Sequence, residues 1–492
     1  MNSSVLLIYP GGLNSLFPEV PLPHLYLASG LQKNGYDVQI FDARLTDINT
    51  IEDKDYLFVG ISSMTGEMIK NALEAARKIR QINPKIPIIW GGIHASLLPD
   101  ETLESEFVDI VVRGEGELTI QDLAHTLETG GDLSDVLGIS YKEAGNILHT
   151  KDRKTMDLDE LDIRLPYHLI DLDKYSLEYF PVVTSRGCPW RCAFCYIVSF
   201  SSRAYRKKSA ERVLDEIEYI VNELGYRKIT FTYDDEYFID IKRVRAITIG
   251  IIERKLDIEW TAFCRFDSFN RVTDEDLKLI EASGCTLISL GGESGSERLL
   301  ANVIKKDITL EMMVEGTRRM AQTGITQVVS MISGVPTETI EDQRETFDFM
   351  DSLYKANPNV VFNGVFLYTP YPGTELYDRA TKDFGFNPPQ SLEEWSEFGI
   401  YRNVGSTWHS KKYIEQCKTL SILTRFPFYR NSFSLKDVNS VLAGQRISKF
   451  PFNWMFYIYT KSAIFRWKRR FFRFPIEYIV LEKYLMKVRG YV

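Results

Sequence analysis

Three cysteines stand close together in one loop and could hold a metal centre. Cys188, Cys192 and Cys195 follow one another with the spacing C-x3-C-x2-C, directly after an apolar stretch. A structural zinc site takes four protein ligands, and no fourth cysteine or histidine stands nearby. An iron–sulfur cluster held by three thiolates keeps one iron free for a substrate or cofactor. The spacing therefore favours an iron–sulfur centre over its two alternatives, a zinc site and three inert core cysteines.

Alternating strands and helices are expected to position this loop. The expected strands are residues 181–184, 228–231, 258–263, 286–290, 327–332 and 360–368. The expected helices are residues 210–224, 241–255, 274–282, 310–322 and 340–355. Six strand–helix units predict a partial parallel (β/α)6 barrel, in which reactive groups collect at the carboxyl ends of the strands. Cys264 and Cys285 lie in or near these strands without partners, so we expect them to pack in the core.

A second alternating series precedes the barrel. Strands rich in Val and Ile are expected at residues 5–9, 37–41, 56–62, 86–90 and 109–112. Apolar residues recur at helical spacing over residues 22–34, 67–82 and 117–129. This alternation predicts a parallel, doubly wound, Rossmann-like sheet of the α/β class.

The chain is expected to divide into four segments. Residues 1–135 form the doubly wound domain, and residues 136–178, irregular and acidic in places, form a linker. Residues 179–385 form the partial barrel. Residues 386–492 form a mainly helical C-terminal region that is dense in aromatic and basic residues from Phe450 onward.

The cysteine loop and the later strand ends resemble the radical S-adenosylmethionine superfamily, in which a C-x3-C-x2-C-aromatic loop binds a four-iron four-sulfur cluster. The resemblance covers at least residues 180–380. It implies that Cys188, Cys192 and Cys195 ligate the cluster and that S-adenosylmethionine chelates the open iron. One electron then releases methionine and a 5′-deoxyadenosyl radical.

The resemblance also implies contacts to S-adenosylmethionine at the ends of the barrel strands. The residues so implied are Tyr196, Asp234, Asp235, Arg265, Glu293 and Gly334. Arg265 is suited to pair with the methionine carboxylate in a bidentate fork, with an ordinary surface ion pair as the alternative. Glu293 would accept hydrogen bonds from the ribose, and the turn at Gly334 would back the adenine. Asp234, Asp235 and Glu236 cannot all face one cofactor, so at least one of these carboxylates is expected to be solvated or to cap a turn.

The loops after the N-terminal strands are rich in Gly, Ser and Thr, so a bulky ligand can approach the backbone closely. No G-x-G-x-x-G follows the first strand and no Walker A sequence occurs, which disfavours a dinucleotide or a nucleoside triphosphate. The Gly-Gly-x-His loop at 91–94 and the Arg-Gly-Glu-Gly-Glu turn at 113–117 resemble the cobalamin-binding domain of many radical S-adenosylmethionine enzymes. The implied cobalamin contacts are Gly11, Ser62, Ser63, Thr65, Gly91, Gly92, His94, Arg113, Gly114 and Glu115.

The sequence D-x-H-x-x-G, which supplies an axial histidine in other cobalamin proteins, is absent. The resemblance, which spans roughly residues 3–130, therefore implies cobalamin bound without a histidine from that motif. His94 could approach the corrin, or it could be a structural hydrogen-bonding residue only.

The resemblance implies a cobalamin-dependent radical enzyme that methylates an unactivated carbon of a small organic or lipid-like substrate. One alternative is radical cyclisation, oxidation or carbon–carbon coupling without methyl transfer, as in anaerobic porphyrin cyclase-like relatives. A non-catalytic sensor that binds the same cofactors is a second alternative. An external one-electron donor such as a flavodoxin or a ferredoxin is the expected partner.

Composition limits the setting of the protein. The chain has 492 residues and a net charge of −8, which argues against nucleic acid as a partner. Its amino terminus lacks the basic start of a signal peptide, and no uncharged apolar run reaches about 18 residues. We therefore expect a cytoplasmic protein in which the cysteines stay reduced.

The aromatic and basic tail has two interpretations. In one it is a helical cap on the barrel, with Lys and Arg along its outer face. In the other it rests on a membrane interface or admits an apolar substrate. The residues concerned are Lys468, Arg469, Arg470 and Arg473 beside Phe471, Phe472 and Phe474.

Overall fold

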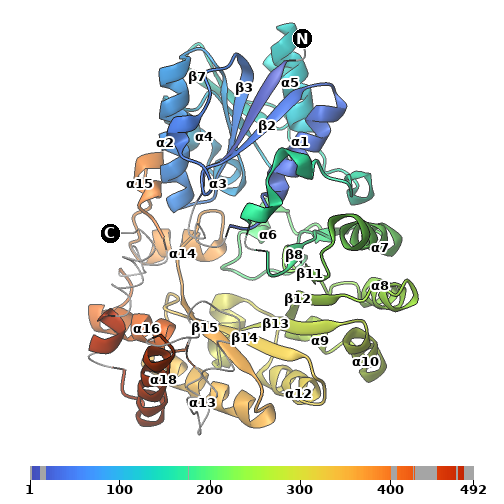
Figure 1. Ribbon diagram of the computed structural model, residues 1–492. Helices are drawn as coiled ribbons and strands as arrows, with labels where there is room; N and C mark the ends of the chain where they lie inside the picture. Colours follow the sequence, from blue (N-terminus) through green and yellow to red (C-terminus); the bar gives the residue numbers. More distant parts are fainter. Residues whose placement is uncertain are drawn as a thin grey trace.

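The N-terminal sheet joins seven strands in the order β2-β1-β3-β4-β5-β6-β7 (Figure 1). The computed structural model describes residues 3–11, 18–175, 177–399, 407–424, 426, 452–472 and 475–480. The strands are β1 (Ser4–Tyr9), β2 (Asp37–Asp42), β3 (Tyr56–Ser62), β4 (Ile88–Gly91), β5 (Ile110–Val112), β6 (Ile139–Glu143) and β7 (Asn146–His149). Strands β1 to β5 pair in parallel, as the sequence predicts.

Residues 139–149 differ from the expected irregular linker, because β6 and β7 form a hairpin that extends the sheet antiparallel to β5. Ile139 and Tyr141 alternate into the core on one face of β6. Ala144 and Gly145 both have positive φ, as a two-residue type I′ turn requires. Alanine rarely takes this conformation, so the usual Asn-Gly signal of such a turn is missing from the sequence.

Helices cover both faces of this sheet. They are α1 (Leu22–Lys33), α2 (Glu67–Ile82), α3 (Ile93–Leu97), α4 (Pro99–Glu104) and α5 (Thr119–Thr129). Alternate residues of β1 enter opposite cores: Val5 and Leu7 face α1 and α5, whereas Leu6 and Ile8 face α2. The sheet is therefore doubly wound, and the carboxyl ends of its parallel strands share one edge.

The second sheet is a six-stranded parallel sheet in the order β15-β14-β13-β12-β11-β8. Its strands are β8 (Phe180–Pro181), β11 (Lys228–Thr230), β12 (Glu259–Arg265), β13 (Cys285–Glu293), β14 (Thr326–Ser333) and β15 (Val361–Leu367). The helices between them are α7 (Ala210–Tyr219), α8 (Ile241–Glu253), α9 (Phe266–Phe269), α10 (Asp274–Ala282), α11 (Glu297–Leu299), α12 (Leu310–Met320) and α13 (Ile340–Ala356). This arrangement confirms the predicted open (β/α)6 architecture.

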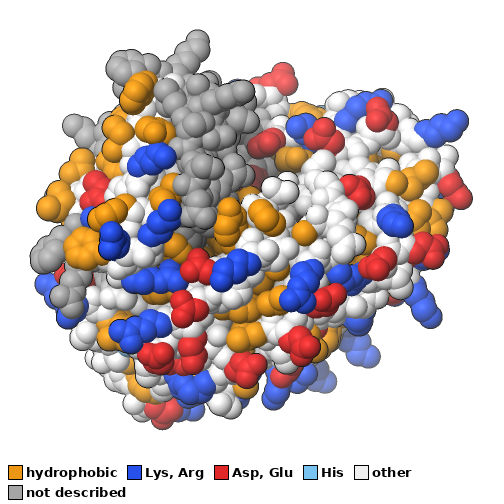
Figure 2. All heavy atoms as spheres, turned by 90° about the horizontal axis from the view of Figure 1, so that it is seen from below, with side chains coloured by type: hydrophobic (Ala, Val, Ile, Leu, Met, Phe, Trp, Pro, Cys, Tyr) orange, Lys and Arg blue, Asp and Glu red, His pale blue; other side chains and the backbone are white. Residues whose placement is uncertain are grey.

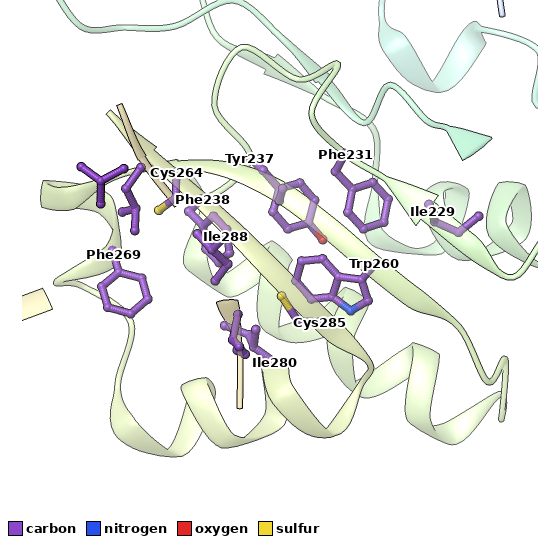
Figure 3. Packing of buried hydrophobic residues seen from close by; sticks show 14 of the residues in the cluster. Ile229, Phe231, Tyr237, Phe238, Trp260, Cys264, Phe269, Ile280, Cys285 and Ile288 are labelled. Carbon is purple, nitrogen blue, oxygen red and sulfur yellow. The ribbon is translucent and has the colours of Figure 1, made fainter. Parts of the chain in front are cut away.

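An aromatic cluster fills the first half of this barrel (Figure 3). Phe231 and Tyr237 stack with ring centroids 4.7 Å apart, and Trp260 packs against both rings. The Trp260 Nε1 group donates a 3.0 Å hydrogen bond to Ser283 Oγ, so its polar atom is satisfied in the core. Cys264 and Cys285 are buried in the same core, as expected.

The first barrel strand is shorter than predicted. Strand β8 ends at Pro181, and the backbone N–H groups of Thr184 and Ser185 donate to the Asp234 side chain instead of to a neighbouring strand. The chain then forms a separate antiparallel ribbon of β9 (Ser185–Arg186) and β10 (Arg206–Lys207). The cysteine loop and helix α6 (Ile197–Phe200) lie between these two short strands.

The described part of the C-terminal region is mainly helical, as expected. Its helices include α15 (Leu392–Ser396), α16 (Lys411–Leu423) and α18 (Phe452–Arg469), and α14 (Glu375–Asp383) precedes them at the end of the barrel segment. Helix α15 returns to the N-terminal domain and packs beside α2, as Figure 1 shows. Arg473 and Phe474 of the expected basic tail lie outside the described residues. Within the described ranges, no helix has the length and apolar character needed to cross a membrane.

Candidate functional site

Two neighbouring carboxylates at the end of β11 hold the start of the cysteine loop. Asp234 accepts hydrogen bonds from the backbone N–H groups of Thr184 (2.6 Å) and Ser185 (2.9 Å) and from both hydroxyls. Asp235 accepts a 2.7 Å hydrogen bond from Gly187 N–H. The sequence assigned both carboxylates to S-adenosylmethionine. Their observed contacts hold the protein loop, and Asp234 is only 1% exposed.

Gly187 is required where the cysteine loop begins. Its φ is +81°, and a Cβ at this position would lie 1.8 Å from the carbonyl oxygen of Ala204. Any other residue would clash with backbone that cannot move away easily. The two ends of the loop therefore touch at their base.

The cysteine side chains sit in a largely desolvated loop. Cys192 is buried, whereas Cys188 and Cys195 are partly exposed. Burial raises the pKa of Cys188 to about 11 and that of Cys195 to about 12, and the neighbouring cysteines add to both shifts. These two thiols are therefore neutral without metal, and metal binding would release their protons.

The donor set fits a cluster better than a single ion. Among the residues that the structure describes, no three His, Cys, Asp or Glu side chains converge as the ligands of one ion would. A cluster distributes its thiolates over separate irons, so its cysteines need not meet at one point. Three cysteines in one loop, with no fourth ligand beside them, fit a cluster with one open iron.

Arg265 lies directly beside the cysteine loop at the end of β12. Its Nη1 is 3.0 Å from Cys192 Sγ, and its Nε donates a 2.9 Å hydrogen bond to Asp267. The guanidinium also stacks over the Trp190 ring at 4.6 Å. Arg265 is thus ion-paired, as the alternative interpretation foresaw, but it is buried and faces the cysteines instead of solvent.

Glu236 is a buried neighbour of Arg265. It accepts hydrogen bonds from the N–H of Phe238 and the hydroxyl of Ser268. Burial raises the pKa of Glu236 to about 7.

Glu293 at the end of β13 has a partner that the sequence did not indicate. Its Oε1 accepts a 2.6 Å hydrogen bond from Lys306 Nζ, and both side chains are buried. A Cβ on Gly291 would overlap this ion pair, so glycine is needed beneath it. No motif marks Lys306, which lies two residues after a helical turn at residues 300–304.

The turn after β14 is backed by the C-terminal region. Gly334 has a φ of +89°, donates its N–H to Glu338 and accepts a 2.9 Å hydrogen bond from Trp408 Nε1. His409 Nε2 lies 2.9 Å from the Val335 carbonyl oxygen. Glu338 is buried, and burial raises its pKa to about 7. The turn that the sequence assigned to adenine is thus held from behind by residues 407–413.

Tyr196 follows Cys195 directly and precedes helix α6. Burial raises the pKa of this tyrosine, and the nearby Asp235 carboxylate adds to the shift. Tyr196 therefore keeps its proton and lies near the carboxylate that holds Gly187.

The loops after β3, β4 and β5 meet at one edge of the N-terminal sheet. Ser63 N–H donates a 3.1 Å hydrogen bond to the Gly91 carbonyl. A Cβ on Gly92 would lie 2.7 Å from the Ser63 carbonyl oxygen and 2.9 Å from Ser62 Oγ. Thr65 Oγ1 lies 3.0 Å from His94 Nδ1. These expected cobalamin residues are therefore neighbours in space.

The other residues expected at cobalamin have different surroundings. Gly11 has a φ of +83° and lies against Arg44 and Asn71. Arg113 donates to the carbonyl oxygen of Thr150 and pairs with Asp152, so it points toward the β7 side. Gly114 N–H donates to Ser96 Oγ, and Glu115 forms ion pairs with Arg186 and Arg206 beside the cysteine loop.

His94 is enclosed instead of facing an open cleft. It is fully buried, and its ring meets the edge of Trp395 from helix α15 at 5.5 Å. Burial lowers the pKa of His94 to about 3, so the imidazole is neutral. The backbone of Phe398 also covers Gly66, where a Cβ would lie 2.9 Å from the Phe398 carbonyl oxygen.

Ser63 Oγ and His94 Nε2 lie in this enclosed region and have no hydrogen-bond partner among the residues that the structure describes. A buried polar atom without a partner costs roughly 1–3 kcal/mol. A polar ligand that entered between the loops could satisfy both atoms. The residues present therefore fit the nucleotide tail or side-chain amides of cobalamin, provided that α15 moves.

Comparisons with known proteins find two family matches along the chain. A model of the radical SAM superfamily matches residues 182–350, and a model of the B12 binding domain matches residues 12–124. An uncharacterized methyltransferase of Pyrococcus horikoshii is 34% identical over 371 residues, which cover 73% of this chain and 78% of that protein. The anaerobic magnesium-protoporphyrin IX monomethyl ester cyclase of Rubrivivax gelatinosus is 28% identical over 399 residues, or 76% of this chain and 69% of that protein.

A solved structure shares the whole architecture. It is that of the cobalamin-dependent S-adenosylmethionine radical enzyme OxsB with aqua-cobalamin and S-adenosylmethionine bound. The TM-score is 0.75, the identity is 19%, and the match covers 99% of this chain and 75% of that chain. At this identity the likeness shows the fold.

Proposed function

The chain belongs to the radical S-adenosylmethionine enzymes that carry a B12-binding domain, and from this premise we propose that it methylates an unactivated carbon of a small organic or lipid-like substrate. Its cofactors are a four-iron four-sulfur cluster, S-adenosylmethionine and cobalamin. When bound, the cluster and S-adenosylmethionine supply a 5′-deoxyadenosyl radical, and cobalamin supplies the methyl group.

The protein's own part is to hold and align these groups. Cys188, Cys192 and Cys195 would ligate the cluster, and Arg265 beside them would pair with the carboxylate of S-adenosylmethionine. Glu293, with Lys306 on one oxygen, would offer the other oxygen to the ribose. The enclosed loops after β3 and β4 would exclude water from the cobalamin.

One contact carries this proposal. Arg186, two residues before Cys188, forms a 2.6 Å ion pair with Glu117 on the loop after β5. The loop expected to hold the cluster is therefore tied to a loop expected to hold cobalamin. Methyl transfer needs both cofactors near one substrate, and this tie supports such an arrangement.

The test needs no substrate. Cluster-reconstituted, cobalamin-loaded enzyme is reduced anaerobically and given S-adenosylmethionine with a deuterated methyl group. We expect S-adenosylhomocysteine together with a deuterated methyl on cobalamin, both measured by mass spectrometry. Recovery of 5′-deoxyadenosine with no S-adenosylhomocysteine would contradict methyl transfer.

That second result would favour radical cyclisation or oxidation. The 28% identity to the Rubrivivax gelatinosus cyclase supports this alternative. A protein that yielded neither 5′-deoxyadenosine nor S-adenosylhomocysteine after reduction would instead behave as a non-catalytic sensor.

We also propose a small acidic electron donor, such as a flavodoxin or a ferredoxin. Arg203 is exposed on the cysteine loop, and its positive charge would attract an acidic partner, whereas the exposed Arg191 is already paired with Asp307. Arg203 also donates a 3.1 Å hydrogen bond to the Pro189 carbonyl, which holds its charge close to the cysteines. Reversal of the charge at Arg203 should slow cluster reduction by flavodoxin but not by dithionite, which separates donor docking from damage to the cluster.

Helix α18 supports a contact with an anionic lipid surface. Its inner side packs on α13, where Trp467 Nε1 donates to Asp351 and Arg470 pairs with Asp348. Its outer side carries an exposed stripe at helical spacing, formed by Trp454, Ile458, Lys461, Phe465 and Lys468. Figure 2 shows apolar side chains with Lys and Arg among them on the left of the molecule, the side on which Figure 1 draws α18.

Apolar residues flanked by bases are typical of helices that lie in a membrane interface. Sedimentation with phosphatidylglycerol vesicles should carry the protein down, and the Lys461→Glu, Lys468→Glu variant should stay in solution. Equal binding to phosphatidylcholine vesicles, or no binding at all, would contradict recognition of anionic lipid.

A further inference from the structure

Two arginines face each other across the short β9–β10 ribbon, where the cysteine loop begins and ends. Strands β9 and β10 close residues 187–205 at their base, and Arg186 stands directly opposite Arg206 in this ribbon. Like charges directly opposite one another destabilise an antiparallel pair. The β9–β10 ribbon therefore needs negative charge from elsewhere in the chain.

That negative charge comes from the N-terminal domain. Glu115 pairs with Arg186 at 3.2 Å and also with Arg206, so one carboxylate bridges both arginines. Glu117 pairs with Arg186 at 2.6 Å. These side chains are only 11–20% exposed. Burial raises the pKa of Glu117, but the charge and hydrogen bond of Arg186, a backbone hydrogen bond and the charge of Arg206 together outweigh burial and lower the pKa below its ordinary value.

Hydrogen bonds continue this contact in both directions. On the barrel side, Gly187 follows Arg186 and donates its N–H to Asp235. On the other side, Gly114 N–H donates to Ser96 Oγ, whose hydroxyl donates to the Gly92 carbonyl. A continuous set of polar contacts therefore links the Gly-Gly turn after β4 to the first residue of the cysteine loop.

We propose that Glu115 and Glu117 are positioning residues that fix the cysteine loop relative to the loops after β4 and β5. This inference rests on the proposed function, in which these loops hold the cluster and cobalamin. A misplacement of about 1 Å can slow a reaction about 100-fold. Loss of both carboxylates should therefore slow methyl transfer more than it slows radical formation, while each cofactor stays bound.

The test compares Glu115→Gln, Glu117→Gln with wild type. The matched control is Glu393→Gln, which removes the exposed 3.2 Å ion pair between Arg77 of the N-terminal domain and α15. The first measurement is amide hydrogen exchange over residues 187–205. We expect exchange about tenfold faster in the double variant and unchanged in the control.

The second measurement is the distance between cob(II)alamin and the reduced cluster by pulsed electron paramagnetic resonance. We expect a broader distance distribution in the double variant, with iron and cobalamin contents equal to wild type. A purely structural role would lower stability and leave the distance distribution narrow. Unchanged exchange together with an unchanged distance distribution would overturn the proposal, and so would equal changes in the control.

Arg186→Lys is a second variant for the same measurements, in case the double variant does not fold. Lysine keeps the charge but lacks the planar fork that meets two carboxylates at once. We expect intermediate exchange rates and an intermediate distance distribution. If cobalamin does not bind, the distance experiment gives no signal and the proposed function fails. The exchange measurement then still decides whether the two carboxylates hold the loop.

Discussion

The Arg265 guanidinium lies 3.0 Å from the sulfur of Cys192 and is held there by Asp267 and by the Trp190 ring. The guanidinium donates a hydrogen bond to this sulfur. Because an arginine presents several N–H donors, the same group can also meet a carboxylate that approaches the open iron.

Arg265→Gln should leave the cluster assembled and weaken the binding of S-adenosylmethionine. A hydrogen bond to a charged group contributes about 1.5–3 kcal/mol, which corresponds to roughly 10- to 100-fold in affinity. Iron content and equilibrium dialysis with S-adenosylmethionine measure the two effects separately. Unchanged affinity for S-adenosylmethionine would limit Arg265 to its contact with Cys192.

Replacement of Cys188, Cys192 and Cys195 by alanine should abolish iron binding and the brown colour of the anaerobic protein. Cys285→Ala is the control, because Cys285 is buried in the barrel core. The control should keep its full iron content although it is less stable. A complete cluster in the triple variant would refute the assignment of these ligands.

Asp234→Asn should destabilise the fold. The N–H and hydroxyl donors of Thr184 and Ser185, which now meet two carboxylate oxygens, would face the NH2 group of an amide. Loss of hydrogen bonds to a charged acceptor costs about 1.5–3 kcal/mol, which denaturant unfolding can measure. Asp215→Asn, at a surface ion pair with Arg254, should change the free energy of unfolding by no more than about 0.5 kcal/mol. An Asp234→Asn protein as stable as this control would exclude a role in holding Thr184 and Ser185.

Glu338 should make stability depend on pH. Burial raises its pKa from the ordinary 4.5 to about 7, so the folded protein holds this proton more tightly than the unfolded chain. The resulting stabilisation is complete below about pH 4.5 and is lost as the pH rises through 7. Relative to Glu338→Gln, wild type should lose about 3 kcal/mol of unfolding free energy across this range. A difference between the two proteins that stays constant from pH 4.5 to 8 would contradict the raised pKa.

Trp395→Ala should open the covered side of the N-terminal loops. Removal of a fully buried tryptophan costs about 3–5 kcal/mol, and it also uncovers His94. We expect lower stability in denaturant but faster uptake of hydroxocobalamin by the apoprotein. Slower uptake would mean that Trp395 forms part of the binding site and does not merely cover it.

Much of the fold could be read from the sequence, because apolar periodicity records which face of each element is buried. Helix α2 matches its expected bounds of residues 67–82, and so does β3 at residues 56–62. The β6–β7 hairpin was missed because Ala144 occupies a turn position that usually carries Asn, Asp or Gly. Local sequence pattern also could not show that Asp234 accepts hydrogen bonds from the backbone of Thr184 and Ser185.

The site was harder to predict, because its partners come from distant parts of the chain. The spacing of the cysteines is local and could be read directly. Glu115 and Arg186, in contrast, are far apart in sequence and meet only when the two sheets come together. Trp395 belongs to a short helix beyond the barrel, and no periodicity assigns such a helix to the first domain. Long-range ion pairs and covers of this kind leave no trace in sequence spacing.

The cover formed by α15 also sets an order of events during synthesis. When the ribosome has added residue 385, every strand of both sheets has been made, but the segment that carries Trp395 and Phe398 has not. Ribosomes add about 5–20 residues per second, so the loops around His94 stay uncovered until translation has passed this point. A corrin that met the chain in this interval would find no α15 over His94, whereas the completed fold encloses this histidine beneath Trp395.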